Sequence, residues 1–495
     1  MSVKMTSENS QLEASRYQLY FRQILTSLAP LLGVVVSGLT SGYSAILLPQ
    51  LKSVGTLNAT GEVLSDEIRV TTIEEESWIA SAAVLPMAPG CWLSGLVMEK
   101  LGRKKSVMLT FPIFTIGWLL IAFANSITCL ILGRLLSGLC VGLLAPLVPV
   151  YISEISDPLL RGILLGGISL ALCLGILIVH IIGTWLHWRT TGYICVVVPC
   201  VCWLICIFSR ESPTWLLNKG LLREAKEAWI YFRGERSLDE YLHLENSRTN
   251  ESKHDNGKSS LVPYLKETLT SRYFLVPLGV LCLFFFTAQF AGTNVIVFYS
   301  VDMLADVAGR ENGYLGSLIV DAVRTIFSGV ACVLVKKCSR RSLTFLSGFG
   351  TAFTLIALSS CLYWEIGKPW VPAFLLMIYT ALLTLGLIPL PWMLCGELFP
   401  RQYRGLGSGF TSGFTFICFF VVVKVAPAMF AALQPYGTFA IYGGITLIGT
   451  ALLALTLPET KDKTLQEIES SFGKKPSKHE ERANAFETIS LSKPV

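Results

Sequence analysis

The chain has 495 residues, of which 52% are hydrophobic and only 15% are charged, and its formal net charge is +6. Soluble domains carry about 25% charged residues, so this deficit favours a membrane protein over one large soluble core. The basic residues are not gathered on one helix face, and this distribution argues against a nucleic-acid-binding protein.

The chain begins with a polar, charged stretch at 1–23. Because no short apolar stretch stands beside the start, we expect no cleaved signal peptide. Twelve apolar segments follow, each close to the ~20 residues that cross a bilayer as a helix. They lie at 28–48, 77–98, 106–124, 127–149, 164–186, 191–208, 274–299, 314–335, 343–363, 371–394, 407–431 and 437–457. Transmembrane β-strands would be shorter and would alternate in polarity, so the pattern predicts an all-α membrane protein with twelve transmembrane helices.

Lysine and arginine residues are concentrated in every second loop, for example at 100–105, after Arg210 and at 336–341. The positive-inside rule places these loops and both termini in the cytoplasm of a multi-pass plasma-membrane protein. The first loop on the opposite side contains the Asn-Ala-Thr sequon at 58–60, so we expect Asn58 to be glycosylated.

The twelve segments fall into two groups of six, separated by a long stretch of mixed charge. This division predicts two helical bundles joined by a cytoplasmic linker with short helices. The predicted parts are an N-terminal tail at 1–27, a first bundle at 28–209, the linker at 210–272, a second bundle at 273–460 and a C-terminal tail at 461–495.

Charged motifs at the cytoplasmic ends of the first six spans occur again, in the same order, in the last six. The matched pairs are Arg103 and Arg340, Glu154 and Glu397, Arg161 and Arg404, and Glu211 and Glu459. An ordered repeat of this kind predicts two pseudo-symmetric six-helix bundles related by an axis along the membrane normal. The substrate cavity is then expected between the bundles, near the midplane of the membrane.

The repeated charges lie at helix ends on one side of the membrane, where ion pairs can hold the two bundles together until that side opens. The alternative is that they are end charges that only set the topology. The predicted cytoplasmic network consists of Glu99, Arg103, Arg134, Glu154, Arg161, Glu211, Arg340, Glu397, Arg404 and Glu459.

Two ionisable residues stand inside the eighth span, where an unpaired charge would be costly. Asp321 and Arg324 are three residues apart and share one helix face, so we expect an intramembrane ion pair. Arg324 either binds substrate oxygens or belongs to a purely structural pair, and the sequence supports both interpretations. His180 in the fifth span is interpreted as a packed or interfacial histidine.

Several longer motifs accompany the charge repeat. They are Gly133-Arg134 to Gly138 with Pro149 and Tyr151, the segment Gln289 to Ser300, Pro389-Leu-Pro391-Trp392, and Pro458-Glu459-Thr460-Lys461. As an ordered set over residues 25–470 they resemble the sugar porters, the glucose-facilitator family of the major facilitator superfamily. The stretch 420–424 is most similar to the insect facilitated trehalose transporter branch.

The resemblance implies that the second bundle holds most of the sugar. Gln289 and Asn294 in the seventh span would hydrogen-bond hydroxyl groups, and Trp392 in the tenth would offer an apolar face to the ring. Amides inside an apolar helix are costly unless paired, which independently marks them as candidates. The alternative is that both amides bond only to neighbouring helices.

Three further candidate contacts differ from the usual family residues. Ser169 stands where the family usually has a glutamine, Thr415 where it has an asparagine, and Arg324 where asparagine is common. Because several family contacts to glucose are replaced, the resemblance leaves open a hexose, a trehalose-like disaccharide or another small solute.

The resemblance implies facilitated diffusion of a sugar by alternating access. The first span has no ionisable residue, which favours passive transport over proton coupling. One alternative is a proton-coupled transporter of a sugar or other organic solute that uses Asp321. The other is a sugar sensor that keeps the fold and does not transport.

No arrangement of catalytic residues, metal ligands or phosphate-binding glycines is found in the sequence. We therefore expect no enzymatic activity, no cofactor and no metal. The expected partners are the small-molecule substrate and the lipid bilayer, and we expect the chain to function as a monomer.

Overall fold

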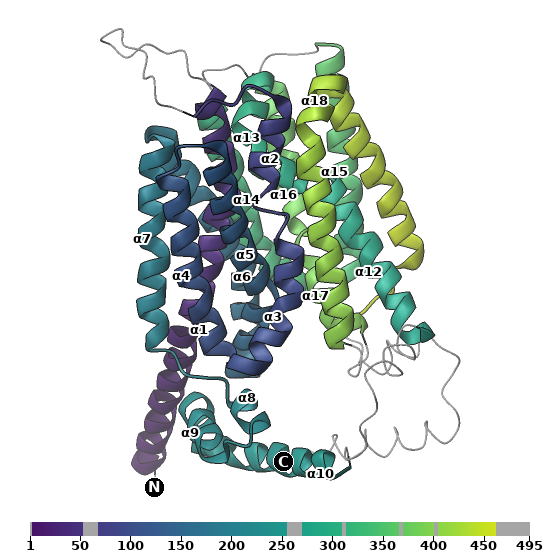
Figure 1. Cartoon of the computed structure of the whole chain (residues 1–495). Helices are drawn as coiled ribbons and strands as arrows, with labels where there is room; N and C mark the ends of the chain where they lie inside the picture. The colour runs from purple at the N-terminus through teal and green to yellow at the C-terminus, as the bar shows by residue number, and fades with distance from the viewer. Residues whose placement is uncertain are drawn as a thin grey trace.

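The computed structural model describes residues 2–52, 68–254, 270–308, 313–365, 370–399 and 404–461, and in this part of the chain the regular secondary structure consists of helices joined by short loops, without strands (Figure 1). The helices are α1 (Ser2–Lys52), α2 (Ile73–Ser81), α3 (Met87–Leu101), α4 (Arg103–Ala122), α5 (Ile127–Ile155), α6 (Pro158–Trp185), α7 (Trp188–Ile207), α8 (Pro213–Asn218), α9 (Leu222–Arg233), α10 (Leu238–His254), α12 (Arg272–Phe290), α13 (Thr293–Ala308), α14 (Gly313–Lys337), α15 (Arg340–Tyr363), α16 (Trp370–Leu385), α17 (Pro389–Leu398) and α18 (Arg404–Thr456).

Ten segments of the described residues are long and apolar enough to cross a membrane. The predicted second span is divided between α2 and α3, each too short to cross alone, because Pro86 and Pro89 remove backbone donors there. The predicted eleventh and twelfth spans both lie in α18, which is kinked at Gln434, where φ is +58°. With these two differences explained, the twelve-helix prediction is confirmed.

Two other spans are broken near their middle. The seventh consists of α12 and α13, and the chain between them turns at Gly292, where φ is +83°. Only glycine adopts this backbone region without strain. The tenth consists of α16 and α17, and Pro389 begins the second part. These breaks matter for function because they free backbone and side-chain polar groups in the interior of a bundle.

Small residues allow helices of one bundle to approach closely. A Cβ atom on Gly38 of α1 would lie 2.3 Å from the carbonyl oxygen of Leu172 in α6, and one on Gly175 would lie 2.2 Å from that of Val35. Such close backbone contacts are typical of helix packing in membranes. Between the bundles, α6 packs against α14, α1 against α13, and α18 against both α2 and α3.

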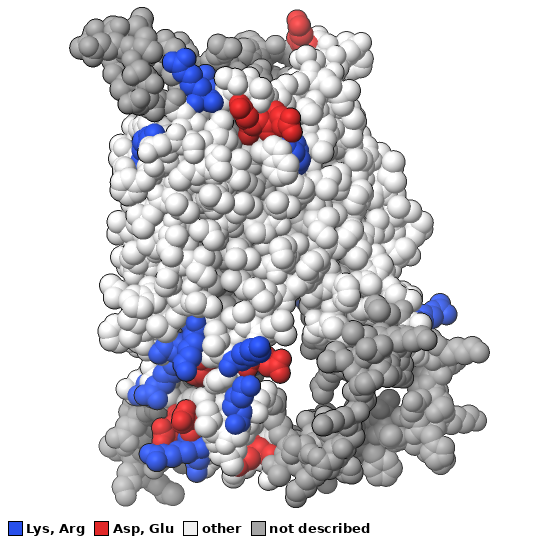
Figure 2. Space-filling view, in the orientation of Figure 1, with Lys and Arg blue, Asp and Glu red and all other residues white. Residues whose placement is uncertain are grey.

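Charged side chains on the face shown in Figure 2 lie at the two ends of the molecule, and an uncharged band separates them. A band of this kind fits the hydrocarbon core of a bilayer. The end that carries α8, α9 and α10, predicted to be cytoplasmic, is called the inner end below, and the opposite end the outer end (Figure 1).

The short helices at the inner end are attached to the first bundle. The side-chain amide of Gln23 in α1 donates to the carbonyl of Phe232 in α9 at 2.7 Å and accepts from the backbone N–H of Asp157 at 2.9 Å. One glutamine thus connects α1, α9 and the start of α6, so these elements form one unit.

Candidate functional site

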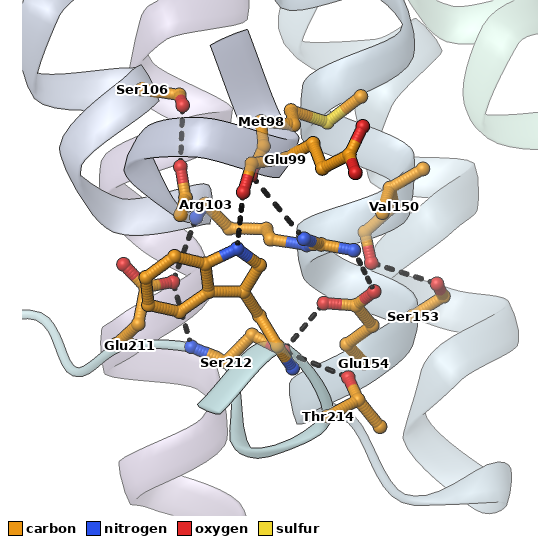
Figure 3. A network of polar contacts seen from close by, with 12 residues as sticks. Met98, Glu99, Arg103, Ser106, Val150, Ser153, Glu154, Glu211, Ser212 and Thr214 are labelled. Carbon is orange, nitrogen blue, oxygen red and sulfur yellow. Dashed lines mark hydrogen bonds and ion pairs between the residues drawn. The ribbon is translucent and has the colours of Figure 1, made fainter. Parts of the chain in front are cut away.

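The first bundle carries a compact network of charges at its inner end (Figure 3). The Arg103 guanidinium lies 2.7 Å from one oxygen of Glu154, and the Ser212 hydroxyl donates to the other. Glu211 accepts from the backbone N–H groups of Arg103 at 2.8 Å and Lys104 at 3.1 Å, the first residues of α4. A carboxylate at a helix N-terminus satisfies unpaired donors and favourably opposes the helix dipole.

The second bundle repeats this network contact by contact. The Arg340 guanidinium lies 3.1 Å from one oxygen of Glu397, and the Thr460 hydroxyl donates to the other. Glu459 accepts from the backbone N–H groups of Arg340 at 3.0 Å and Arg341 at 3.2 Å, at the start of α15. The charge repeat in the sequence therefore corresponds to a repeat in three-dimensional contacts.

Within the described residues, these two networks connect helices of the same bundle and do not connect the bundles to each other. The prediction that they tie the bundles together does not describe this conformation. Their geometry is that of an internal brace: three helix ends of one bundle are held by one arginine and two carboxylates.

Two residues of the predicted cytoplasmic network, Arg134 and Glu99, do not take part in the two networks described above. Arg134 lies seven residues into α5 from its outer end, where it is fully buried and donates to the Thr40 carbonyl at 2.8 Å and to the Ser44 hydroxyl. Its assignment to the cytoplasmic network is wrong, because it lies at the wrong depth and connects α5 to α1. Glu99 contributes its backbone carbonyl to Trp215, while its exposed carboxylate makes no ion pair among the described residues.

Of the two remaining members of the predicted network, the structure describes the side chain of Arg161 but not that of Arg404. Arg161 donates to the Ser156 carbonyl at 3.3 Å, a local contact at the start of α6. The side chain of Arg404 and the glycosylation site Asn58 lie outside the part of the chain that the structure describes.

At the outer end, by contrast, polar contacts join the two bundles. Lys52 of α1 lies 2.9 Å from Asp302 of α13 and 2.7 Å from Glu76 of α2. Lys424 of α18 donates to Ser77 of α2 at 2.7 Å. The structure therefore has its outer side closed by contacts between the bundles, whereas the two inner charge networks do not connect the bundles to each other.

The predicted amide pair lies at the break in the seventh span. Asn294 Nδ2 donates to Gln289 Oε1 at 2.6 Å across the turn at Gly292, and both side chains are partly exposed. The Tyr379 hydroxyl donates to the carbonyl of Ala291 at 2.6 Å, which satisfies a backbone group freed by the break. The second hydrogen-bonding atom of each amide has no recorded protein partner in the described residues and can bind a solute.

An aromatic cluster lies about one turn of α12 away from Gln289. The Trp392 ring packs edge-on against Phe285 of α12, with 5.0 Å between ring centroids, and 6.3 Å from Phe416 of α18. Phe285 is four residues before Gln289 and thus on the same face of α12. Trp392 is nevertheless 41% exposed, so part of the indole remains uncovered.

Two further candidate sugar contacts, Thr415 and Ser169, take no part in the hydrogen bonding of the amide pair within the described residues. The Thr415 hydroxyl is buried and donates to the Thr411 carbonyl of its own helix at 2.8 Å. Ser169 is partly buried in α6. Among the described residues, neither side chain forms a hydrogen bond with the amide pair.

The predicted intramembrane ion pair is present, with Arg324 Nη1 3.4 Å from Asp321 Oδ1. Sequence reasoning missed a third member, since the His180 ring contacts the other oxygen of Asp321 from the opposite bundle. A histidine inside an apolar span was the available signal, because such residues are costly unless they have a polar partner.

Comparisons with known proteins agree with this architecture. The family model for "Sugar (and other) transporter" matches residues 25–472. The facilitated trehalose transporter Tret1 of Polypedilum vanderplanki is 30% identical over 91% of this chain and 88% of its own length, and that of Bombyx mori is 28% identical over 94% and 91%. The fold is similar to an inward open conformation of the xylose transporter XylE from E. coli, with a TM-score of 0.71, 20% identity and coverage of 90% and 99%. The chain belongs to the sugar transporter family of the major facilitator fold.

Proposed function

We propose that this protein carries an uncharged sugar, a hexose or a trehalose-like disaccharide, across the plasma membrane by facilitated diffusion. Membership of the sugar transporter family supports a sugar, and the relatives that are facilitated trehalose transporters support the disaccharide and the passive mechanism. The charge distribution of the loops supports cytoplasmic termini.

The observation that carries the proposal is the amide pair at the broken seventh span. Gln289 and Asn294 bind each other through one atom each and leave the second partly exposed. An amide offers both donors and acceptors, which suits hydroxyl groups. The exposed part of the Trp392 indole can supply an apolar surface for a sugar ring.

Alternating access follows from the asymmetry between the two ends. Contacts of Lys52 and Lys424 close the outer end, while the inner networks stay within their own bundles. If the bundles rock about the amide pair, opening the outer end requires these outer contacts to break. The braced inner ends can then approach as rigid bodies.

The test is uptake of labelled trehalose, glucose and fructose into proteoliposomes, with and without a pH gradient. We expect at least one sugar to equilibrate by a saturable process without a gradient. Asn294→Ala and Trp392→Ala should each reduce uptake about tenfold, roughly the effect of losing one good hydrogen bond or aromatic contact to the solute.

Two matched controls separate this effect from general damage. Asn218→Ala removes an exposed amide from α8, and Trp370→Ala removes a 62% exposed indole from α16, and both should transport normally. Absence of flux for every sugar would favour a sensor. Accumulation driven by the pH gradient would favour a proton-coupled carrier.

A further inference from the structure

A buried polar contact crosses between the bundles close to their outer end. His180 of α6 and Asp321 of α14 have side chains only 0% and 2% exposed, and ring Nδ1 contacts carboxylate Oδ2. His180 is five residues before the outer end of α6 at Trp185, a depth of about 8 Å along the helix. Opening the outer side would therefore pull the two residues apart.

The other ring nitrogen determines how many protons the contact holds. His180 Nε2 lies 2.9 Å from the carbonyl oxygen of Gly42 in α1, and because a carbonyl only accepts, Nε2 carries a hydrogen. Nδ1 then either donates a second hydrogen to an ionised Asp321 or accepts one from a protonated Asp321. In both cases one further proton lies between the two side chains. Without it, lone pairs on nitrogen and oxygen would face each other at contact distance.

We propose that His180 and Asp321 form a proton-binding site between the two bundles, so that proton binding stabilises the conformation closed at the outer side. The proposal concerns the conformational equilibrium and holds whichever solute the protein carries.

The structure also contains partners for both side chains after the proton has left. Ser317 Oγ lies 3.2 Å from His180 Nδ1 and can donate to it, while Ser300, 2.7 Å from Ser317, can donate in turn. Asp321 Oδ1 is 3.4 Å from Arg324, whose two terminal nitrogens have no hydrogen-bond acceptor among the described residues. The carboxylate can therefore turn from the histidine to the arginine.

This exchange of partners changes the strength of the contact between the bundles. In the protonated arrangement a bond of the histidine–carboxylate type connects α6 to α14. In the deprotonated arrangement, the neutral bond from Ser317 replaces the histidine–carboxylate contact between α6 and α14 at this place, since Asp321 pairs within α14. Charge-assisted hydrogen bonds are roughly twice as strong as neutral ones. Loss of the proton therefore favours separation of the bundles at the outer end.

The net charge of the cluster also depends on the other titratable side chains around the pair. Arg324 faces Asp321 from α14, Cys173 approaches both from α6, and Tyr379 approaches Arg324 from α16. Thiol and phenol groups are neutral near neutral pH. Helix α1 contributes the Gly42 carbonyl and α13 the Ser300 hydroxyl. The cluster thus carries one net positive charge with the proton and none without it.

Two variants test whether the cluster holds a titratable proton. Asp321→Asn keeps the charge of the protonated cluster, and its side-chain N–H can donate to His180 Nδ1 without a titratable proton. His180→Gln keeps the charge of the deprotonated cluster and can donate to Asp321. Neither variant retains the proton shared between the two side chains, so each should lose the pH dependence. His187→Gln, at the exposed outer end of α7, is the matched control.

The test uses the full-length protein in nanodiscs without sugar and measures hydrogen–deuterium exchange at the outer ends of α1 and α13. Exchange is corrected for the intrinsic pH dependence of the amide rate, with α9 as internal reference. When the pH is raised from about 5 to about 8, corrected exchange should rise about fivefold in the wild type and in His187→Gln. It should be flat in both Asp321→Asn and His180→Gln, because neither variant retains the shared proton.

A wild-type profile that is flat after correction would overturn the proposal without reference to any variant. A wild-type-like slope in either cluster variant would overturn it too. Because no sugar is present, these outcomes are independent of whether the protein transports trehalose, glucose or another solute.

Discussion

The inner and outer ends of the molecule both carry ion pairs, but these pairs connect different parts. At the inner end, Arg103 with Glu154 and Arg340 with Glu397 each hold helices of a single bundle together. At the outer end, Lys52 with Asp302 joins one bundle to the other. Charges inside a bundle make it rigid, whereas charges between bundles determine the conformation, so similar side chains serve two separate purposes.

This contrast predicts different consequences for the two sets of contacts. Removing an inner brace should lower the stability of the fold in every conformation. Removing an outer contact should leave the fold stable and change how often the outer side opens.

The largest expected effect follows from breaking the inner brace of the first bundle. Glu154→Ala leaves the Arg103 guanidinium and the Ser212 hydroxyl without their acceptor in a site where Arg103 and Glu154 are 14% and 16% exposed. The cost is about 2 kcal/mol, since a charged group loses its partner in a partly buried place. We expect the apparent melting temperature of the purified protein to fall by several degrees.

The second bundle and an exposed acid provide the controls for this measurement. Glu397→Ala should destabilise less, because Glu397 is 27% exposed and its ion pair is longer at 3.1 Å. Glu99→Ala should leave the melting temperature unchanged. An equal loss for Glu99 and Glu154 would show that the brace is not what stabilises the inner end.

A second prediction concerns the turn that supports the same brace. Gly102 has φ of +91°, and a Cβ atom there would lie 2.5 Å from Glu211 Oε2. Gly102→Ala should therefore cost about 1–2 kcal/mol through backbone strain and displacement of the carboxylate. Gly95→Ala, where nothing lies within 4 Å of the added carbon, should change the melting temperature little or raise it.

A smaller effect, and one of a different kind, is expected at the outer end. Asp302→Asn weakens the contact of Lys52 with the other bundle, but these side chains are 30% and 37% exposed. Ion pairs of this exposure contribute roughly 0.2–1 kcal/mol. Melting temperature should be nearly unchanged, while hydrogen exchange at the outer end of α13 should rise by up to about fivefold. Arg223→Ala, which removes the exposed pair with Glu227, should alter neither measurement.

The brace could be predicted from sequence because its parts lie at helix ends with fixed spacing in both halves. The same reasoning placed Arg134 wrongly, since it grouped residues by charge and ignored that Arg134 lies close to the outer start of α5. The contact of His180 with Asp321 could not be predicted, because these residues are 141 positions apart and meet only through the relative position of the bundles. Local patterns thus indicate the rigid parts and not the contacts that form between them.

The smallest expected effect tests the brace of the second bundle through pH. Partial burial of Glu459 raises its pKa, but backbone N–H groups of Lys461, Arg341 and Arg340 lower it by more, so the pKa lies below its usual 4.5. A carboxyl whose pKa is lowered by folding stabilises the protein above pH 4.5 and loses this contribution as pH falls toward the lowered value. When pH falls through this window, the melting temperature of the wild type should therefore decrease more than that of Glu459→Gln. Because the group is only partly buried, the difference should be small, and a larger acid sensitivity in Glu459→Gln would contradict the assignment of these hydrogen bonds.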